Sequence, residues 1–340
     1  MGKHTVLGFL REQWTELPVS SANIGDKSLL VVGANAGLGF EASVHLALLK
    51  PGKLLLTCRD EIKCDQTKRE VEQRSKASDI SSWPLELNSF ESVRTFVDRF
   101  ETEGGRLDVL VANAGVSRFD YTQTQDGWET TLQVNYLSTA LLSILMLPHL
   151  IASSTPEAAS RLLIVSSEAH YLANRLKGAN KWPSILGKLN DVKYCSASIM
   201  RDRYNISKLL EIMFMRELAA RLPFPTPVSV SAINPGFCHS NLAKEIEASP
   251  LIGYPFRAFK GIFARSTEMG SRTLVHPAVA PNERTRHGRY LSSYEVTEES
   301  DYVLSDEGIE ISKRLWAETL EVLGKVDGRV TQIVSQYLSP

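Results

Sequence analysis

Short hydrophobic runs alternate with longer amphipathic stretches along most of the chain. Several runs are apolar over their whole length, which is typical of strands buried on both faces of a sheet. The predicted strands are Leu29–Val32, Leu54–Cys58, Pro84–Leu87, Leu107–Ala112, Leu162–Ser166, Val228–Ile233 and Arg289–Leu291. The predicted helices are Leu38–Leu49, Ile62–Gln73, Phe90–Glu103, Trp128–Leu150, Tyr204–Leu222, Thr267–Val275 and Ile309–Leu323. This alternation predicts an α/β fold with one doubly wound, seven-stranded, mostly parallel sheet and helices on both faces.

Two long connections, residues 168–203 and 237–265, interrupt this rhythm without a clear hydrophobic period. Loops of such length in a compact domain usually serve a function, so we expect both to border a substrate. The second is rich in aromatic residues, and we interpret it as a mobile lid, with a fixed pair of short helices as the alternative. Because no repeat or Pro/Ser-rich linker is visible, we expect a single domain over 27–340 after an N-terminal extension, 1–26.

Composition and charge exclude several classes of protein. The chain has 38 Lys and Arg against 39 Asp and Glu, so it lacks the basic excess that nucleic-acid binding needs. Its four cysteines form no CxxC pair, which argues against a disulfide scaffold and a structural zinc site, and its seven histidines show no metal-ligand spacing. The longest apolar stretch, Ser138–Ile151, is too short to span a bilayer. We therefore expect a cytoplasmic protein without a transmembrane segment or metal.

A glycine-rich turn directly after the first predicted strand is the first candidate for chemistry. Gly33, Gly37 and Gly39 follow Leu29–Val32 with GxxxGxG spacing, and a helical pattern begins within the turn. Glycines let the backbone approach a pyrophosphate closely, and the positive end of the next helix stabilises its charge. The same three glycines are also compatible with an ordinary tight turn.

Further polar residues follow the later strands. The segment Asn113–Gly115 ends the fourth strand and Ser167 follows the fifth, at the edge where doubly wound sheets bind ligands. Asn135 lies within a helical pattern, where a solvent-facing position is the alternative to a functional one. Tyr204 and Lys208 share one helix face, and a lysine charge lowers the pKa of a nearby phenol from about 10. A solvated pair would show the same spacing.

These motifs and their order along the chain resemble those of the short-chain dehydrogenase/reductase family over residues 27–292. The resemblance implies a Rossmann-type domain. The closest likeness is to the retinol-dehydrogenase-like branch and fungal secondary-metabolism reductases, through Ser166–His170, Tyr204–Glu211 and Asn234–Ser240. The residues that the resemblance implies to be catalytic are Asn135, Ser167, Tyr204 and Lys208. Those it implies to bind the cofactor are Gly33, Asn35, Ala36, Gly37, Leu38, Gly39, Arg59, Glu86, Leu87, Asn113, Ala114, Gly115, Tyr204, Lys208, Pro235, Gly236, Cys238 and Ser240.

The chain departs from the family pattern at three positions near the cofactor. Val32 stands where a threonine usually precedes the first glycine, and Ala112 replaces the first asparagine of the common NNAG motif. Glu86 holds the place of the aspartate that usually faces the adenine. These departures concern the fine geometry of cofactor binding, because the four residues matched to catalysis are all present.

The end of the second strand predicts which dinucleotide binds. An acidic residue there would bind the 2′-hydroxyl of NAD, whereas an arginine suits the 2′-phosphate of NADP. Cys58 occupies the usual acidic position and Arg59 follows it, so we expect NADP(H). Asp60 has an alternative role as the N-cap of the next helix.

The resemblance implies hydride transfer between NADPH and a ketone or aldehyde, or a secondary alcohol in reverse. Tyr204 would exchange the proton, Ser167 would hold the same oxygen, Lys208 would lower the phenol pKa and bind the ribose, and Asn135 would hold a relay water. The aromatic run Tyr254–Phe259 indicates a bulky apolar substrate. The family resemblance also leaves a homodimer open.

Two other kinds of function remain open from the sequence. The same scaffold could belong to a catalytically degenerate dinucleotide-binding protein or to an isomerising enzyme. A serine hydrolase could use Ser167 with His170, but no GxSxG motif occurs in the chain.

Overall fold

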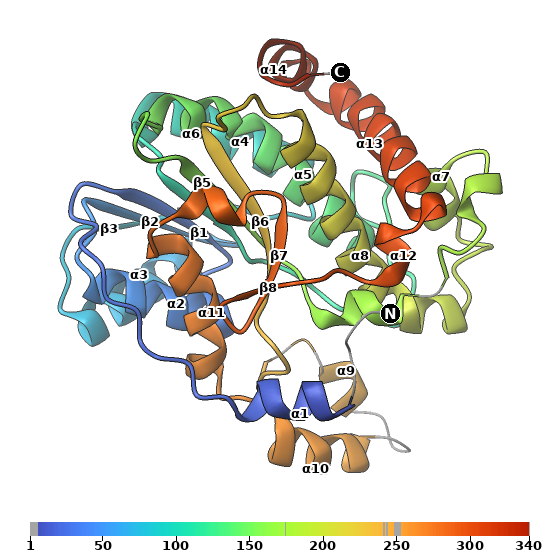
Figure 1. Cartoon of the computed structure of the whole chain (residues 1–340), viewed down its shortest axis with the longest axis horizontal. Helices are drawn as coiled ribbons and strands as arrows, with labels where there is room; N and C mark the ends of the chain where they lie inside the picture. Colours follow the sequence, from blue (N-terminus) through green and yellow to red (C-terminus); the bar gives the residue numbers. More distant parts are fainter. Residues whose placement is uncertain (1–5, 174, 241, 243, 248–252, 340) are drawn as a thin grey trace.

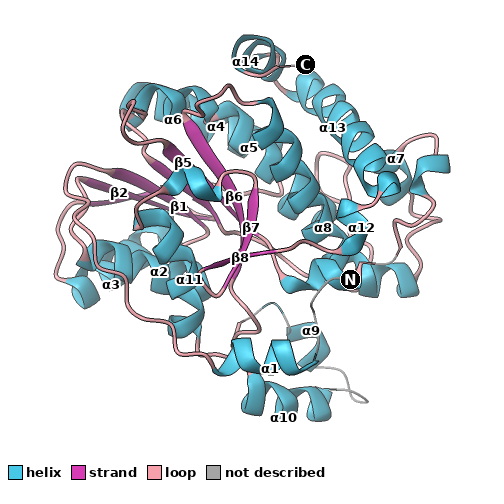
Figure 2. Cartoon of the chain, viewed as in Figure 1, coloured by secondary structure: helices cyan, strands magenta, loops and turns pink. Residues whose placement is uncertain are grey.

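A parallel sheet with one antiparallel edge strand organises the computed structural model, which describes residues 6–173, 175–240, 242, 244–247 and 253–339. Its eight strands lie in the order β3-β2-β1-β4-β5-β6-β7-β8 (Figures 1 and 2). They are β1 (Ser28–Val32), β2 (Lys53–Cys58), β3 (Ile80–Pro84), β4 (Val109–Ala112), β5 (Ser160–Val165), β6 (Val228–Asn234), β7 (Arg289–Ser292) and β8 (Glu295–Thr297). The α/β class is confirmed.

The predicted strands are wrong at both edges of the sheet. The predicted count of seven omits β8, because its three residues include no buried apolar run. The predicted third strand, Pro84–Leu87, is displaced, since β3 ends at Pro84, where the predicted strand begins. Leu85 and Leu87 are 4 % exposed and pack in the core beyond the strand end. Their apolar character therefore reflects packing outside the sheet.

Helices cover both faces of the sheet (Figure 2). The main ones are α2 (Gly37–Leu48), α3 (Glu61–Ser75), α4 (Phe90–Arg99), α5 (Ser138–Leu145), α6 (Leu147–Ser153), α8 (Ala197–Arg221), α11 (Thr267–Val279) and α13 (Asp306–Val326). The predicted continuous helix Trp128–Leu150 is wrong. Its residues form the π-helical segment η2 (Leu132–Leu137), then α5 and the start of α6, where Pro148 supplies no N–H to an earlier turn.

Further helices lie outside the predicted ones, including some in the two long connections. They are α1 (Val6–Trp14), η3 (Glu168–Leu172), α7 (Ile185–Asn190), α9 (Lys244–Glu247), α10 (Gly253–Phe263), α12 (Asp301–Leu304) and α14 (Arg329–Tyr337). The described part of segment 237–265 thus carries α9 and α10, and its movement as a lid stays a prediction.

Among the described residues, no single helix is long and apolar enough to cross a membrane. By length and composition, one bent pair passes that test together, Leu132–Leu145 with Leu147–Ser153, at an angle of 44°.

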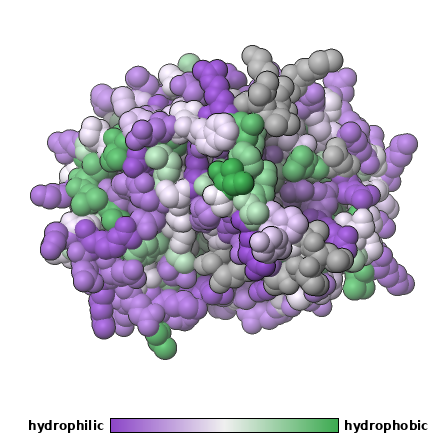
Figure 3. All heavy atoms as spheres, turned by 90° about the horizontal axis from the view of Figure 1, so that it is seen from below, coloured by the Kyte–Doolittle hydropathy of each residue, from purple (hydrophilic) through white to green (hydrophobic). Residues whose placement is uncertain are grey.

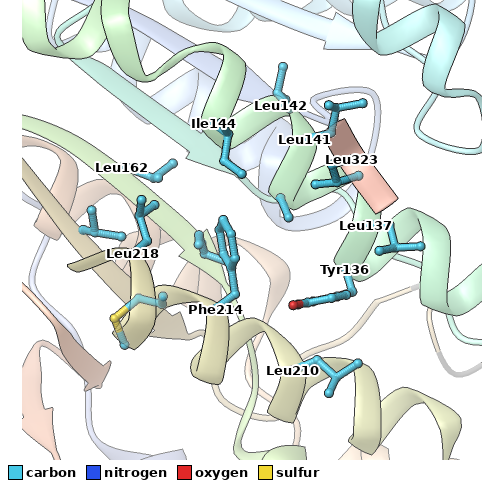
Figure 4. Close-up of a cluster of buried hydrophobic side chains, with 14 of the residues drawn as sticks. Tyr136, Leu137, Leu141, Leu142, Ile144, Leu162, Leu210, Phe214, Leu218 and Leu323 are labelled. Carbon is cyan, nitrogen blue, oxygen red and sulfur yellow. The ribbon is translucent and has the colours of Figure 1, made fainter. Parts of the chain in front are cut away.

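The two faces of the sheet carry separate hydrophobic layers. In β1, Leu30 and Val32 face the layer formed with α4, α5, α8 and α13, whereas Leu29 and Val31 face the layer formed with α2 and α11. This explains why the strand is apolar throughout. Figure 4 shows the first layer, in which the rings of Tyr136 and Phe214 meet edge to face at 6.3 Å. The layers leave the carboxyl ends of the strands as the open edge.

A buried ion pair fixes the start of α8 against η2. Glu129 and Arg203 are both 0 % exposed, and Arg203 Nε lies 3.3 Å from Glu129 Oε2. The Glu129 carboxylate also accepts hydrogen bonds from the N–H groups of Thr131 (2.8 Å) and Leu132 (2.9 Å). The pair therefore joins the segment that carries Asn135 to the helix that carries Tyr204.

We predict that Glu129→Gln lowers the free energy of unfolding by about 3–5 kcal/mol, because it leaves the Arg203 charge buried without its counter-charge. Urea denaturation followed by circular dichroism measures this. The control is Glu157→Gln at an exposed loop position, where a change within about 0.5 kcal/mol is expected. Equal stability of the two variants would contradict the prediction.

Candidate functional site

The glycine turn after β1 has a conformation that requires its glycines. Gly33 and Gly37 adopt φ angles of +75° and +64°, which residues with side chains rarely adopt. A methyl group on Gly39 would lie 2.4 Å from both Asn113 Nδ2 and the Gly33 carbonyl oxygen. Asn113 Nδ2 in turn donates to the carbonyl of Val32 at 3.0 Å. The turn is thus packed tightly against the end of β4.

The first turn of α2 offers unused backbone N–H groups. The helix begins at Gly37 after the extended residue Ala36, and no side chain caps it. Its first turn contains no acidic residue. Asn35 and Leu38 are partly exposed beside it. Since an uncapped helix N-terminus attracts anions, this turn fits the pyrophosphate of a dinucleotide.

The residues predicted after β2 and β3 differ in accessibility. Arg59 follows β2 directly, is exposed, and makes no ion pair within the described part of the chain. Asp60 caps α3 by accepting from Lys63 N–H at 2.9 Å, so its alternative role is confirmed. Glu86 is partly exposed after β3, whereas Leu87 is a core residue. The structure therefore brings Arg59 and Glu86, but not Leu87, to the open edge.

Asn135 is fully buried, so the solvent-facing interpretation is wrong. Its Oδ1 accepts from Val116 N–H at 2.8 Å and its Nδ2 donates to the Val116 carbonyl at 2.9 Å. This pairing holds Asn113–Gly115 in place after β4. A methyl group on Gly115 would lie 3.4 Å from Asn135 Oδ1 and 3.6 Å from Lys208 Nζ. Asn135 and Lys208 therefore meet beside Gly115, and the π-helical turn that carries Asn135 is of a kind frequent at functional sites.

Ser167 and Tyr204 meet at the end of β5. The Ser167 hydroxyl accepts from Ala169 N–H at 3.1 Å at the start of η3, and its nearness to the Tyr204 phenol acts to lower the pKa of that phenol. Lys208 lies one helical turn after Tyr204, with Nζ 5.6 Å from the centre of the tyrosine ring. The structure thus brings together Asn135, Ser167, Tyr204 and Lys208 from three separate elements.

Glu211 is a neighbour of Lys208 to which we assigned no role from the sequence. Lys208 Nζ donates to Glu211 Oε1 at 2.9 Å and to the Val165 carbonyl at 2.8 Å, and both charged side chains are less than 5 % exposed. Burial raises the pKa of Glu211 to about 7, against the opposing effect of Lys208. For Lys208, burial alone would lower the pKa, but Glu211 and Tyr204 outweigh it and raise the pKa. In the sequence, this pair could have been found from the spacing of three residues between Lys208 and Glu211, which places both side chains on one face of a helix.

We expected the charge of Lys208 to bring the pKa of Tyr204 below its usual value. This expectation is wrong, because the combined effect of all surrounding groups raises that pKa. Burial of the phenol is the largest effect and raises the pKa of Tyr204 above 10. The charge of Lys208 acts in the expected direction, while Glu211 opposes it. Tyr204 therefore keeps its proton at neutral pH in this environment.

The segment after β6 shapes the far side of the site. Gly236 follows Pro235 with a φ angle of +78°. Cys238 Sγ donates to the Pro235 carbonyl at 3.3 Å, and burial raises the pKa of this thiol to about 12. A methyl group on Gly270 of α11 would lie 2.3 Å from Cys238 Sγ. Cys238 is thus packed beneath α11, whereas Ser240 is partly exposed.

Glu168 is a second ionisable residue beside the site to which we assigned no role from the sequence. It follows Ser167, and its N–H donates to Asn234 Oδ1 at 3.1 Å. Burial and, less strongly, the nearby charge of Glu12 raise the pKa of this carboxyl group to about 7, although Arg265 acts to lower it. A carboxyl group that titrates near neutral pH therefore lies next to Ser167.

Several known proteins are similar to this chain in sequence. A family model described as short chain dehydrogenase matches residues 27–175. A short chain dehydrogenase/reductase, dmxR8, of Cryptosporiopsis sp. is 34 % identical over 330 residues, covering 96 % of this chain and 99 % of the relative. The short chain dehydrogenase atnD of Emericella nidulans is 35 % identical over 293 residues, covering 84 % of this chain and 90 % of the relative.

Solved structures share the fold at lower sequence identity. The Pseudomonas aeruginosa RhlG/NADP active-site complex aligns with a TM-score of 0.59 and 22 % identity, covering 79 % of this chain and 96 % of that one. L-sorbose reductase from Gluconobacter frateurii, complexed with NADPH and L-sorbose, aligns with a TM-score of 0.59 and 16 % identity. The alignment covers 81 % of this chain and 98 % of that one.

We predict that Glu168 makes stability fall as pH rises. Its pKa is about 7 in the folded chain against an ordinary 4.5, so the folded state binds more protons between these values. Its contribution is therefore fully present below about pH 4.5 and is lost as pH rises through 7. Relative to wild type, Glu168→Gln should gain about 1–3 kcal/mol of stability between pH 5 and pH 8.

Urea denaturation at the two pH values measures this change. The control is Glu295→Gln, whose side chain is exposed, and its stability should stay parallel to that of the wild type. Parallel pH dependence of Glu168→Gln and wild type would contradict the raised pKa.

Proposed function

The chain belongs to the short-chain dehydrogenase/reductase family, and from this premise we propose that it is an NADPH-dependent reductase of bulky apolar ketones or aldehydes. Family members are oxidoreductases that act on C=O or CH–OH groups with a nicotinamide cofactor. One observation carries the proposal: Asn135, Ser167, Tyr204 and Lys208 converge at the open carboxyl edge of the sheet, beside a turn that fits a pyrophosphate.

The proposed chemistry assigns a separate task to each side chain. A bound reduced nicotinamide would supply the hydride to the carbonyl carbon. Tyr204 gives its phenolic proton to the carbonyl oxygen, and Ser167 hydrogen-bonds the same oxygen. Lys208, kept charged by Glu211, stabilises the phenolate that remains after the transfer.

Asn135 acts in this proposal as a positioning residue. Its side-chain amide already bonds both backbone groups of Val116 and the Ser207 hydroxyl (2.9 Å). Both N–H groups of the amide are therefore used within the protein, while Oδ1 keeps one lone pair for the relay water that we expected. Its task is to hold Gly115 beside Lys208.

The proposed preference for NADPH depends on the end of β2. Cys58, at the position usual for an acidic residue, is 1 % exposed, and the next residue, Arg59, is exposed to solvent without an ion pair among the described residues. A free guanidinium at this edge suits a 2′-phosphate, which an aspartate would repel.

Aromatic residues directly after Gly236 support an apolar substrate. The ring of Phe237 lies 6.0 Å from Phe256 and 5.5 Å from Phe259, and Phe259 lies 4.7 Å from Phe263. This cluster gives the open edge an apolar wall next to the proposed nicotinamide position.

The geometry does not support a serine hydrolase. His170 Nδ1 lies 2.8 Å from the backbone carbonyl of Ser167, and its Nε2 accepts from Ser300 N–H at 3.2 Å. The imidazole proton is therefore on Nδ1 and points to a carbonyl, so His170 does not take a proton from the Ser167 hydroxyl.

The experiment that tests the proposed function is a substrate panel. The purified chain is mixed with NADPH or NADH and hydrophobic ketones and aldehydes, and loss of the reduced-cofactor absorbance is followed. Hydrophilic carbonyls of similar reactivity are the control. We expect turnover of apolar carbonyls with NADPH, and the absence of turnover across the panel would overturn the proposal.

We predict that Tyr204→Phe lowers kcat at least about 10²-fold, because the ring stays in place but the transferable proton is lost. NADPH affinity, measured by fluorescence titration, should change little. Tyr337→Phe, in the distant helix α14, is the matched control and should leave kcat unchanged. A Tyr204→Phe protein with nearly normal turnover would remove Tyr204 from the chemistry.

We predict that Arg59→Ala weakens NADPH binding by about 1.5–3 kcal/mol and leaves NADH binding nearly unchanged, since only NADPH carries the 2′-phosphate. Fluorescence titration with both cofactors measures the difference. Arg69→Ala, at an exposed position of α3, controls for the general loss of positive charge. Equal weakening of NADPH and NADH binding would show that Arg59 does not contact the phosphate.

A further inference from the structure

The N-terminal helix α1 is part of the wall around the proposed active site. We expected residues before 27 to be only an extension of the domain. Figure 1 shows α1 beside α10 at the lower edge of the molecule, and the two helices are in contact. Figure 3 views this side and shows hydrophobic side chains gathered on a largely hydrophilic face. From α1, Gln13 reaches Phe237 in the segment that follows β6, and Glu12 reaches Ser292 at the end of β7.

Gln13 ties both ends of segment 237–265 to α1. Its side chain is 6 % exposed. Nε2 donates to the carbonyl of Phe237 at 2.7 Å and to that of Phe263 at 3.0 Å. Oε1 accepts from Phe237 N–H at 3.0 Å. One buried amide thus pairs with Phe237 in both directions and also holds the end of α10.

The same amide lies against Gly236. A methyl group at this glycine would be 2.7 Å from Gln13 Oε1 and 3.0 Å from Arg265 Nη1. Arg265 is itself buried, and its guanidinium donates to the Pro235 carbonyl (3.4 Å), to Ser293 Oγ (2.9 Å) and to the backbone carbonyl of Glu12. Gln13 and Arg265 therefore hold the Pro235–Gly236 backbone between them.

A second chain of hydrogen bonds leads from α1 toward Ser167. Glu12 Oε2 accepts from Ser292 Oγ at 2.9 Å, and Ser292 Oγ accepts from Asn234 Nδ2 at 3.0 Å. Asn234 Oδ1 then accepts from the N–H of Glu168 at 3.1 Å. Helix α1 is thus connected by side chains to the residue that follows Ser167.

We propose that Gln13 is a positioning residue. Through it, α1 sets the place of Pro235–Gly236 against the nicotinamide half of the cofactor, and the place of Phe237 and α10 against the substrate. This inference rests on the proposed reductase function. Displacements of about 1 Å in a site can cost up to about 10²-fold in rate. When a change weakens binding of the ground state and the transition state equally, KM rises and kcat stays nearly unchanged.

The test compares Gln13→Met with Arg11→Met, which places the same residue at an exposed position of α1. For Gln13→Met we expect the Kd of NADPH and the KM of the carbonyl substrate to rise about tenfold, with kcat within about threefold of wild type. Arg11→Met should match the wild type. Circular dichroism establishes that each variant is folded at the assay temperature.

Ser292→Ala is a second variant, which interrupts the link between Glu12 and Asn234 without changing α1. It should raise the same two constants about threefold, since it removes one connection and leaves the Gln13 hydrogen bonds in place. A Gln13→Met protein with a lower melting temperature but unchanged Kd and KM would give Gln13 a structural role only and overturn the inference. If Gln13→Met does not fold, unchanged constants in Ser292→Ala overturn it.

Failure of the proposed function gives a different result. In that case no carbonyl in the panel is reduced by the wild type at the expense of NADPH. Titration with NADPH still compares the affinities of Gln13→Met and Arg11→Met. Equal affinities of these two variants would overturn the role of Gln13, and a tenfold loss of affinity confined to Gln13→Met would support it.

Discussion

The positive charge of Lys208 lies almost out of contact with water, and the arrangement of the site follows from how this charge is held. A buried ammonium without partners would lose its proton. Here Nζ donates to the Val165 carbonyl at the end of β5 and to Glu211 on its own helix. Ser166 Oγ also donates to the Lys208 carbonyl at 2.9 Å, which fastens β5 to α8. Because β5 and α8 are joined at this point, Ser167 after β5 lies next to Tyr204 on α8.

The same charges set the protonation state of Tyr204 before the proposed chemistry begins. Burial keeps Tyr204 protonated, and Lys208 lies close enough to stabilise the phenolate once the proton has left. A protonated phenol beside a fixed ammonium is prepared to give its proton to a developing alkoxide. Oxidation of an alcohol would need the phenolate first, and burial disfavours that form. The electrostatics of the site thus agree with carbonyl reduction.

Local sequence predicted the features that depend on neighbouring residues. The apolar run of β1, the glycine turn and the pair Tyr204 and Lys208 are each set within a few residues. The α/β fold could therefore be predicted and most candidate site residues could be named, while their roles stay predictions. What failed depends on packing across the chain. Gln13 bonds Phe237, which is 224 positions away, and no local pattern signals such a contact. The raised pKa of Tyr204 likewise comes from burial, which spacing alone does not reveal.

The two halves of the proposed site come from different parts of the chain. The segment matched by the family model, 27–175, carries the glycine turn, Asn135 and Ser167. Tyr204, Lys208 and the aromatic cluster lie beyond it, and α1 lies before it. The outer parts are fastened to the core by their own packing, such as the stacking of Trp316 of α13 on Phe214 of α8 at 5.7 Å. Because the glycine turn lies in the matched segment while the aromatic cluster around Phe237 lies outside it, the proposed substrate wall can vary in this architecture without disturbing the turn that would hold the pyrophosphate.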